Sequence, residues 1–290
     1  MVTGRVGTLD PVPYAAADDG TRIWYDLSGK RSGDAVVMIQ GLGADSRGWA
    51  FQRRAIGRSH RVITVDNRGV GRSDRVRTFD LEVMATDVLA VLDHAGVDAA
   101  HVIGASMGGV IAQIMAARHP RRVRSMVLCC TAARHHEWRR ELLEDWAEVA
   151  SQQGMRALLG RAMRWLIGPR SHRRFAAPIG LLGHLILSCP AESFVGQIEA
   201  ILAMDDAVAD EARGVTIPVL IVVGSQDILT PAGDSEELAE IYTNSDLVLI
   251  NGAAHGFMVQ HARELNRLIA DHLEAHADAR PRHLRPASAA

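Results

Sequence analysis

The stretch His101-Val102-Ile103-Gly104-Ala105-Ser106-Met107-Gly108-Gly109-Val110 decides the fold of this 290-residue chain. An apolar run precedes its Gly-x-Ser-x-Gly segment, and a helical pattern follows it. This strand–turn–helix context favours a turn that presents a nucleophilic serine over a small-residue turn that only closes a strand–helix unit. Glycines let the strand and helix approach closely, and the serine itself must take a strained backbone conformation. We therefore expect the Ser106 hydroxyl above the sheet, at a helix N-terminus whose dipole favours negative charge.

Apolar runs alternate with helical patterns on both sides of this stretch. Strands are predicted at 12–16, 21–27, 35–40, 61–66, 101–105, 123–130, 218–224 and 247–250, and helices at 81–95, 107–119, 235–242 and 261–276. The turn Asp18-Asp19-Gly20 joins the first two strands as a hairpin. Such alternation is typical of an α/β fold with a mostly parallel central sheet and helices on both faces.

Residues 132–208 interrupt this alternation. They contain no convincing strand, and apolar residues recur at helical spacing at Trp138, Leu142, Leu143 and Trp146. We predict a helical cap over 132–208, inserted between a first core part (1–131) and a second core part (209–276). The last residues, 277–290, are rich in Arg, Pro, Ala and Ser, a composition typical of a disordered tail.

A serine hydroxyl becomes a good nucleophile when a histidine removes its proton. Thirteen histidines compete for this role, and most lie on predicted helices or at their ends. His255 instead lies in the small-residue loop Asn251-Gly252-Ala253-Ala254-His255-Gly256-Phe257, directly after a late strand. Such a loop carries the imidazole over the carboxyl edge of the sheet, where Ser106 is also expected.

The histidine needs a carboxylate that fixes its tautomer, and Asp227 in Val223-Gly224-Ser225-Gln226-Asp227 fits because it follows another strand. Asp66 also ends a strand, but it precedes the serine and begins a turn, so we interpret it as a turn-bracing residue. Three further aspartates belong to the approach to the strand that precedes Asp227: Asp205, Asp206 and Asp210. The chain order Ser106, Asp227, His255 is typical of one family of hydrolases.

At this point the sequence resembles the α/β-hydrolase superfamily over nearly the whole chain outside the cap and tail. Gln40-Gly41-Leu42-Gly43 resembles its His-Gly-x-Gly oxyanion loop, and the segment from Asp66 to Asp74 resembles its Asp-x-Arg-Gly-x-Gly-x-Ser turn. The subgroup resembled comprises cofactor-free esterases, enol-lactonases and metal-free haloperoxidases or perhydrolases. Two positions depart from the family pattern. Gln40 replaces the usual His, and Ala105 precedes the nucleophile where His is common.

This resemblance implies a hydrolase with an α/β-hydrolase fold and an inserted helical cap. Ser106 attacks a carbonyl, His255 acts as general base and acid, and Asp227 orients His255. The backbone N–H groups of Leu42 and Met107 are expected to form the oxyanion hole.

For the substrate pocket we predict four residues, namely Gln40, Trp49, Trp138 and Phe257. The cap contains three tryptophans, Trp138, Trp146 and Trp165. For each of them, packing within the cap is favoured over facing the pocket.

Composition narrows the function classes. A net charge of −2 argues against a nucleic-acid binder. We interpret Cys129, Cys130 and Cys189 as core thiols. We predict no metal because no His, Asp or Glu cluster has metal-ligand spacing, and no cofactor because the chain lacks a Gly-x-x-x-x-Gly-Lys motif and a complete dinucleotide fingerprint. With neither a signal-peptide pattern nor a long apolar run, we predict a cytoplasmic protein without a membrane partner. The oligomeric state stays open.

The predicted activity is hydrolysis of a small-molecule ester, lactone or thioester through an acyl-enzyme. A C–C bond hydrolase or a perhydrolase with the same triad is the alternative, and a non-catalytic ligand-binding protein of the same fold is the least favoured. A serine at the elbow argues against haloalkane dehalogenase and epoxide hydrolase chemistry, which need a carboxylate there. Arginines recur over 155–175 without an acid, and for this stretch a solvated helix face is favoured over attraction of an anionic substrate.

Overall fold

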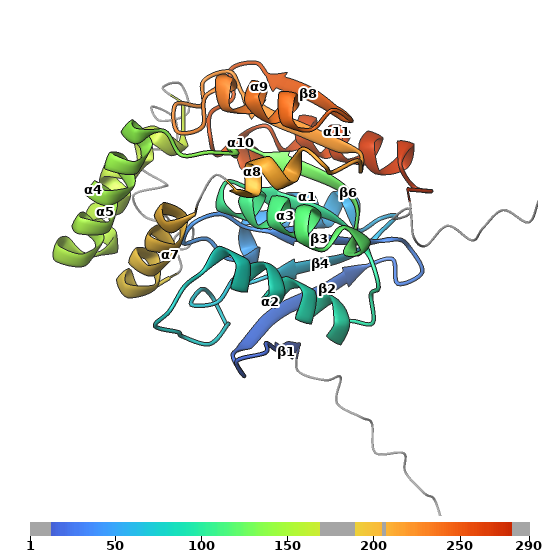
Figure 1. The fold of residues 1–290 in the computed structure, drawn as a ribbon, viewed down its shortest axis with the longest axis horizontal. Coiled ribbons are helices and arrows are strands. Elements are labelled where there is room, and N and C mark those ends of the chain that lie inside the picture. Colours follow the sequence, from blue (N-terminus) through green and yellow to red (C-terminus); the bar gives the residue numbers. More distant parts are fainter. Residues whose placement is uncertain (1–12, 169–188, 205–206, 280–290) are drawn as a thin grey trace, which may run out of the picture.

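One eight-stranded sheet organises the part of the chain that the computed structural model describes, residues 13–168, 189–204 and 207–279. Its order is β1-β2-β4-β3-β5-β6-β7-β8 (Figure 1). The strands are β1 (Tyr14–Ala16), β2 (Arg22–Gly29), β3 (Ala35–Ile39), β4 (Arg61–Val65), β5 (Ala100–Ala105), β6 (Val123–Cys129), β7 (Val219–Gly224) and β8 (Ser245–Ile250). β2 pairs antiparallel with β1 and β4, and all other pairs are parallel. The predicted α/β class and mostly parallel sheet are confirmed.

Helices cover both faces of this sheet (Figure 1). The α-helices described are α1 (Ala50–Ile56), α2 (Leu81–His94), α3 (Met107–Arg118), α4 (Glu137–Gln153), α5 (Met155–Leu166), α7 (Ala191–Ala203), α8 (Ala207–Ala212), α9 (Ala232–Ile241), α10 (Phe257–Gln260) and α11 (Ala262–Ala275). Two short 3₁₀ turns, η1 (Ser46–Trp49) and η2 (Pro120–Arg122), precede α1 and β6. Side chains of α2, α3 and α9 pack in one apolar core, and those of α1 and α11 pack in the other.

The two cores follow from the two-residue period of a strand. In β3, Val37 and Ile39 belong to the core of α2 and α3, whereas Val36 and Met38 belong to the core of α1 and α11. A strand buried on both faces is apolar throughout, which is why it reads as a continuous run in the sequence.

The helices α4, α5 and α7, which we call the cap helices, are inserted between β6 and β7. They lie together at one side of the molecule (Figure 1), and α4 packs against both α5 and α7. Among the described residues no helix combines the length and apolar character needed to cross a bilayer. The predicted start of the first strand, at residue 12, and residues 280–290 of the predicted tail lie outside the described residues.

The structure differs from the sequence prediction mainly at short helices. We did not predict α1 or α10, because neither is long enough to show a clear helical period. α9 begins at Ala232, three residues earlier than expected, with Pro231 at its N-cap position.

Candidate active site

Ser106 lies at the sharp turn between β5 and α3. Its φ of 52° and ψ of −120° fall in a region that non-glycine residues rarely adopt. Hydrogen bonds fix this backbone: the Ser106 N–H donates to the carbonyl oxygen of Cys129 (2.9 Å). The Ser106 carbonyl accepts from the Gly109 N–H and from the Thr131 hydroxyl, both at 2.8 Å. The turn therefore holds the serine in a strained conformation, as expected of a nucleophile elbow.

The glycines around Ser106 are needed for close backbone contact. A Cβ atom at Gly108 would collide with the carbonyl oxygen of Ile39 in β3. At Gly109 it would lie 2.6 Å from the Cβ of Thr131. The small residues of the elbow thus let α3 start directly against the ends of β3 and β6.

Asp227 and His255 form a hydrogen-bonded pair. The distance between His255 Nδ1 and Asp227 Oδ2 is 2.9 Å. An ionised carboxylate only accepts hydrogen bonds, so Nδ1 carries the proton and Nε2 is free to accept one. Both side chains are buried, at 5% exposure for each residue. This is the arrangement in which a carboxylate fixes the tautomer of a histidine base.

The Asp227 carboxylate is held by three further donors. Its Oδ1 accepts from the backbone N–H groups of Leu229 (2.9 Å) and Thr230 (3.0 Å), and its Oδ2 accepts from the Thr230 hydroxyl (2.9 Å). Burial alone would raise the pKa of Asp227, but His255 and the two Thr230 donors outweigh it, so the pKa lies below its usual value. Asp227 is therefore a carboxylate in the resting protein.

The topology of the sheet brings these residues to one edge. Ser106 follows β5, Asp227 follows β7 and His255 follows β8, and these strands are parallel within one sheet. Cys130, just beyond β6, lies between them: its side chain is within 4.8 Å of ligand atoms of Asp227 and His255, and it interacts with the Ser106 backbone. The Ser106 hydroxyl makes no hydrogen bond to any described residue. Contacts between nucleophile and base are often long before substrate binds.

Near Ser106, the backbone N–H groups of Leu42 and Met107 donate to no acceptor in the described part of the chain. Met107 opens α3, and Leu42 follows Gly41, whose Cβ position would lie 3.0 Å from the Cβ of Ser106. Both residues therefore adjoin parts of the chain next to Ser106, and their role as donors to an oxyanion stays a prediction.

The comparisons with known proteins identify the family of this chain. The α/β hydrolase fold family matches residues 34–158. A relative named carbamate hydrolase RutD, from Stutzerimonas stutzeri (strain A1501), is 30% identical over 260 residues, covering 86% of this chain and 96% of the relative. This chain belongs to the α/β-hydrolase family.

Solved α/β-hydrolase structures superpose over nearly the whole chain. The enol-lactonase from Burkholderia xenovorans LB400 has a TM-score of 0.84 at 29% identity and covers 90% of this chain and 100% of its own. A thermophilic esterase from Thermogutta terrifontis has a TM-score of 0.83 at 25% identity, with coverages of 91% and 98%. The resemblance to this subgroup and the assignment as an enzyme are thus confirmed.

In this α/β hydrolase, Gln40 and Asp66 brace the loops around the site. Gln40 Oε1 accepts from the Gly41 N–H at 3.3 Å, and the Gln40 carbonyl accepts from Asn67 Nδ2 at 3.0 Å. Asp66 is fully buried and accepts from the backbone N–H groups of Ser46 (2.9 Å) and Arg72 (3.0 Å). The predicted turn-bracing role of Asp66 is confirmed, whereas a contact of Gln40 with substrate stays a prediction.

The predicted aromatic pocket residues of the hydrolase have different environments. Trp49 and Phe257 are fully buried in the apolar core shared with α1 and α11. Trp138 is 39% exposed and stacks on Trp165, with ring centroids 6.3 Å apart. Trp146 is buried in the cap, as the preference for packing predicted. Contacts of Trp49, Trp138 and Phe257 with substrate stay predictions.

The arginine-rich cap stretch of the hydrolase is described only in part. Arg156, Arg161 and Arg164 lie on α5, and Arg170, Arg173 and Arg174 lie outside the described residues. Arg161 forms an exposed ion pair with Asp145 (3.1 Å), which is typical of a solvated helix face.

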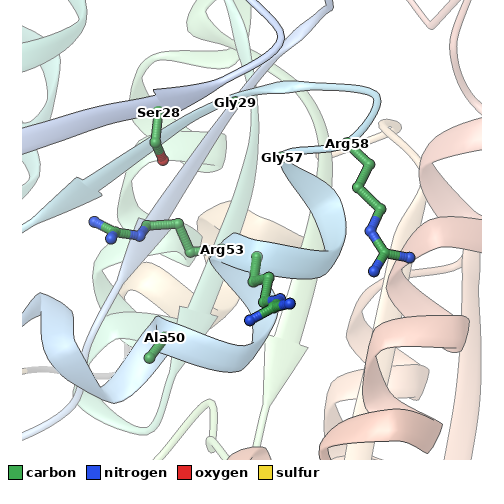
Figure 2. Close-up of a pocket in the computed structure, with 7 residues that line it drawn as sticks. Ser28, Gly29, Ala50, Arg53, Gly57 and Arg58 are labelled. Carbon is green, nitrogen blue, oxygen red and sulfur yellow. The ribbon is translucent and has the colours of Figure 1, made fainter.

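A cavity of about 470 Å³ lies away from the proposed triad of this hydrolase. It opens between β2 and α1, where Ser28, Gly29, Ala50 and Arg53 contribute to its lining (Figure 2). No predicted catalytic or pocket residue lines it, so we do not assign it to the substrate.

A group of three possible metal ligands also lies within the site: Cys130, Asp227 and His255. His255 Nδ1 and Asp227 Oδ2 are hydrogen-bonded to each other, and burial raises the pKa of the Cys130 thiol well above its usual value. We therefore interpret the group as the surroundings of the triad and assign no metal to it.

Sequence reasoning missed Thr230, Arg139 and Gln197, three buried polar residues that contact the loops of this site. Thr230 had a local signal, because a hydroxyl three residues after an aspartate often bonds to it. Arg139 and Gln197 had none, since their partners are distant in the chain.

Proposed function

We propose that this α/β hydrolase is a serine hydrolase that cleaves a carboxylic ester or lactone through an acyl-enzyme. Ser106 is the nucleophile, His255 the general base and acid, and Asp227 the residue that orients His255. The observation that carries the proposal is the buried Asp227–His255 pair, with 2.9 Å between Oδ2 and Nδ1, at the sheet edge that also holds the strained Ser106.

The first half of the cycle forms the acyl-enzyme. His255 Nε2 accepts the Ser106 hydroxyl proton while Oγ attacks the substrate carbonyl carbon. The negative charge on the carbonyl oxygen is stabilised by the N–H groups of Leu42 and Met107, whose donors are not engaged elsewhere in the described chain. Asp227, held as a carboxylate, stabilises the imidazolium that forms.

The second half releases the products. The imidazolium gives its proton to the leaving oxygen, and the alcohol departs, or stays tethered when the substrate is a lactone. Water then loses a proton to His255 and attacks the acyl carbon, and Ser106 leaves as a free hydroxyl. Each step uses only these side chains, two backbone N–H groups and water.

We propose esters and lactones as the substrate class because the two structural neighbours described above are an enol-lactonase and an esterase. A second candidate is carbamate hydrolysis, favoured by the relative named carbamate hydrolase. That reaction would use the same attack and leave a carbamoyl group on Ser106. The alternatives of C–C cleavage and perhydrolysis need the same triad, and the residues do not distinguish them.

Product analysis tests the proposal. Purified protein and its Ser106→Ala variant are incubated with matched panels of aryl and alkyl esters, lactones, carbamates and β-diketones, and with hydrogen peroxide plus acetate. We expect turnover of esters or lactones by the wild type and its loss in Ser106→Ala. Cleavage that survives in Ser106→Ala, or cleavage confined to β-diketones, contradicts the proposal.

A further inference from the structure

Within the described part of the chain, the cap helices contact through hydrogen bonds three of the four segments that carry the proposed site, the exception being the Ser106 turn. From α7, Gln197 reaches Gly43 in the loop of Leu42. From α4, Arg139 reaches the loop of Asp227, and the carbonyl of Leu166, at the end of α5, accepts from the Gly256 N–H of the His255 loop at 2.7 Å. Two of these contacts come from buried polar side chains, which act on different parts of the chemistry.

Gln197 holds the loop that contains the Leu42 donor. Its side chain is fully buried, and its Oε1 accepts from the Gly43 N–H at 2.9 Å. Gly43 has a φ of 69°, and a Cβ there would lie 2.8 Å from Cδ2 of Phe194 in α7. The loop therefore lies close against α7. Because Gly43 directly follows Leu42, the hydrogen bond from Gln197 fixes the direction of the adjoining peptides.

Arg139 holds the loop that contains Asp227. Its side chain is 2% exposed, and its Nε donates to the carbonyl oxygen of Leu229 at 2.9 Å. The N–H of the same Leu229 donates to Asp227 Oδ1 at 2.9 Å. Leu229 thus connects Arg139 of the cap with Asp227 of the proposed triad.

The other partners of Arg139 fix its place. It donates to the carbonyl of Arg134 at 3.0 Å and forms a buried ion pair with Asp234 of α9. Buried ion pairs are weak sources of stability because desolvation opposes them. The buried Arg139–Asp234 pair is better explained if it fixes one conformation of the Asp227 loop than if it stabilises the fold.

We propose that Gln197 and Arg139 are positioning residues through which the cap helices preorganise the catalytic loops, Gln197 for the oxyanion hole and Arg139 for the Asp227–His255 pair. This inference rests on the proposed function. The cap helices then take part in the site directly, because their packing sets the positions of two catalytic loops.

Replacement of each residue is expected to change a different measurement, which we call its signature. The signature of Gln197 is the affinity for a boronic acid, and that of Arg139 is the low-field proton signal of the His255–Asp227 hydrogen bond. Gln197→Met keeps the side-chain volume but removes the acceptor for the Gly43 N–H. We expect kcat with an ester to fall roughly tenfold to a hundredfold, as is typical of a small misplacement of a catalytic group. Affinity for a boronic acid that forms a tetrahedral adduct with serine is expected to weaken as well. The low-field proton NMR signal of the His255–Asp227 hydrogen bond is expected to stay.

Arg139→Met is expected to broaden or remove that low-field proton signal and to lower kcat by a similar factor. Arg139→Lys keeps the charge beside Asp234 and is expected to restore part of the signal. Matched controls come from the same cap. Arg140→Met removes a guanidinium that bonds the Leu202 carbonyl at 2.9 Å, and Gln152→Met removes an exposed amide. Both controls are expected to leave the two signatures unchanged.

Gly43→Ala tests the Gln197 arm independently, because it displaces the same loop without touching Gln197; the same pattern as Gln197→Met is expected. The proposal is wrong if the two signatures stay at wild-type level, or if every cap variant loses both of them in parallel with its melting temperature. A wild type that neither turns over esters nor forms the boronate adduct would refute the proposed function. The Arg139 effect on the His255–Asp227 signal would still be decided by NMR.

Discussion

Replacement of Asp227 by asparagine changes one atom of the proposed triad and reverses a hydrogen bond. In the wild type, Oδ1 accepts from the N–H groups of Leu229 and Thr230, while Oδ2 accepts from His255 Nδ1. Asparagine can keep its oxygen toward the two backbone donors. Its NH₂ group then faces His255 Nδ1, which must become an acceptor, so the ring proton moves to Nε2.

An imidazole protonated at Nε2 cannot accept the Ser106 proton. The same tautomer error in serine proteases lowers kcat by ~10⁴-fold, which corresponds to about 5 kcal/mol of transition-state stabilisation. Because the two backbone bonds to Oδ1 can remain, the loop should keep its shape. We therefore expect a small change in stability, on the order of 1 kcal/mol for the weakened hydrogen bonds.

The assay is steady-state hydrolysis of p-nitrophenyl acetate, with thermal unfolding measured in parallel. Asp246→Asn, an exposed substitution on β8, is the matched control and should behave as the wild type. The reasoning is refuted if Asp227→Asn retains kcat within tenfold of the wild type. It is also refuted if activity falls only because the variant is unfolded at the assay temperature.

Two further outcomes are expected. Gly108→Ala should lower the unfolding free energy by about 1–3 kcal/mol in urea titrations, because the new Cβ collides with the carbonyl of Ile39; an unchanged midpoint contradicts this. Burial lowers the pKa of His101 to about 3, so between that value and ~6.5 the unfolded chain binds a proton that the folded chain does not. Stability should therefore fall on acidification, by about 2 kcal/mol between pH ~7 and ~5, and His101→Gln should remove that share of the loss in urea titrations; an equal loss in both proteins contradicts it.

The sheet and the elbow were predictable because their signals are local. β3 and β7 are apolar throughout since both faces are buried, and the glycines around Ser106 directly reflect contacts with Ile39 and Thr131. Chain order and strand ends led us to predict a pairing of Asp227 with His255 among many acids and histidines. The structure places these two side chains in direct contact.

The cap contacts were not predictable because they depend on packing between distant segments. Arg139 reads as one more charge on an amphipathic helix, yet it is buried beside Leu229, 90 residues later. Gln197 lies in an apolar run, and its side-chain oxygen accepts a hydrogen bond from the N–H of Gly43, which lies 154 residues earlier in the chain. Nothing in the spacing of either residue indicates such a partner.

The most direct test is intact-protein mass spectrometry after reaction with a fluorophosphonate probe, followed by peptide mapping. The account predicts one adduct per chain, located on Ser106, and no adduct in Ser106→Ala; labelling should be much slower in His255→Ala. Absence of any adduct on the folded wild type, or an adduct on another residue, would contradict the claim that Ser106 is an activated nucleophile.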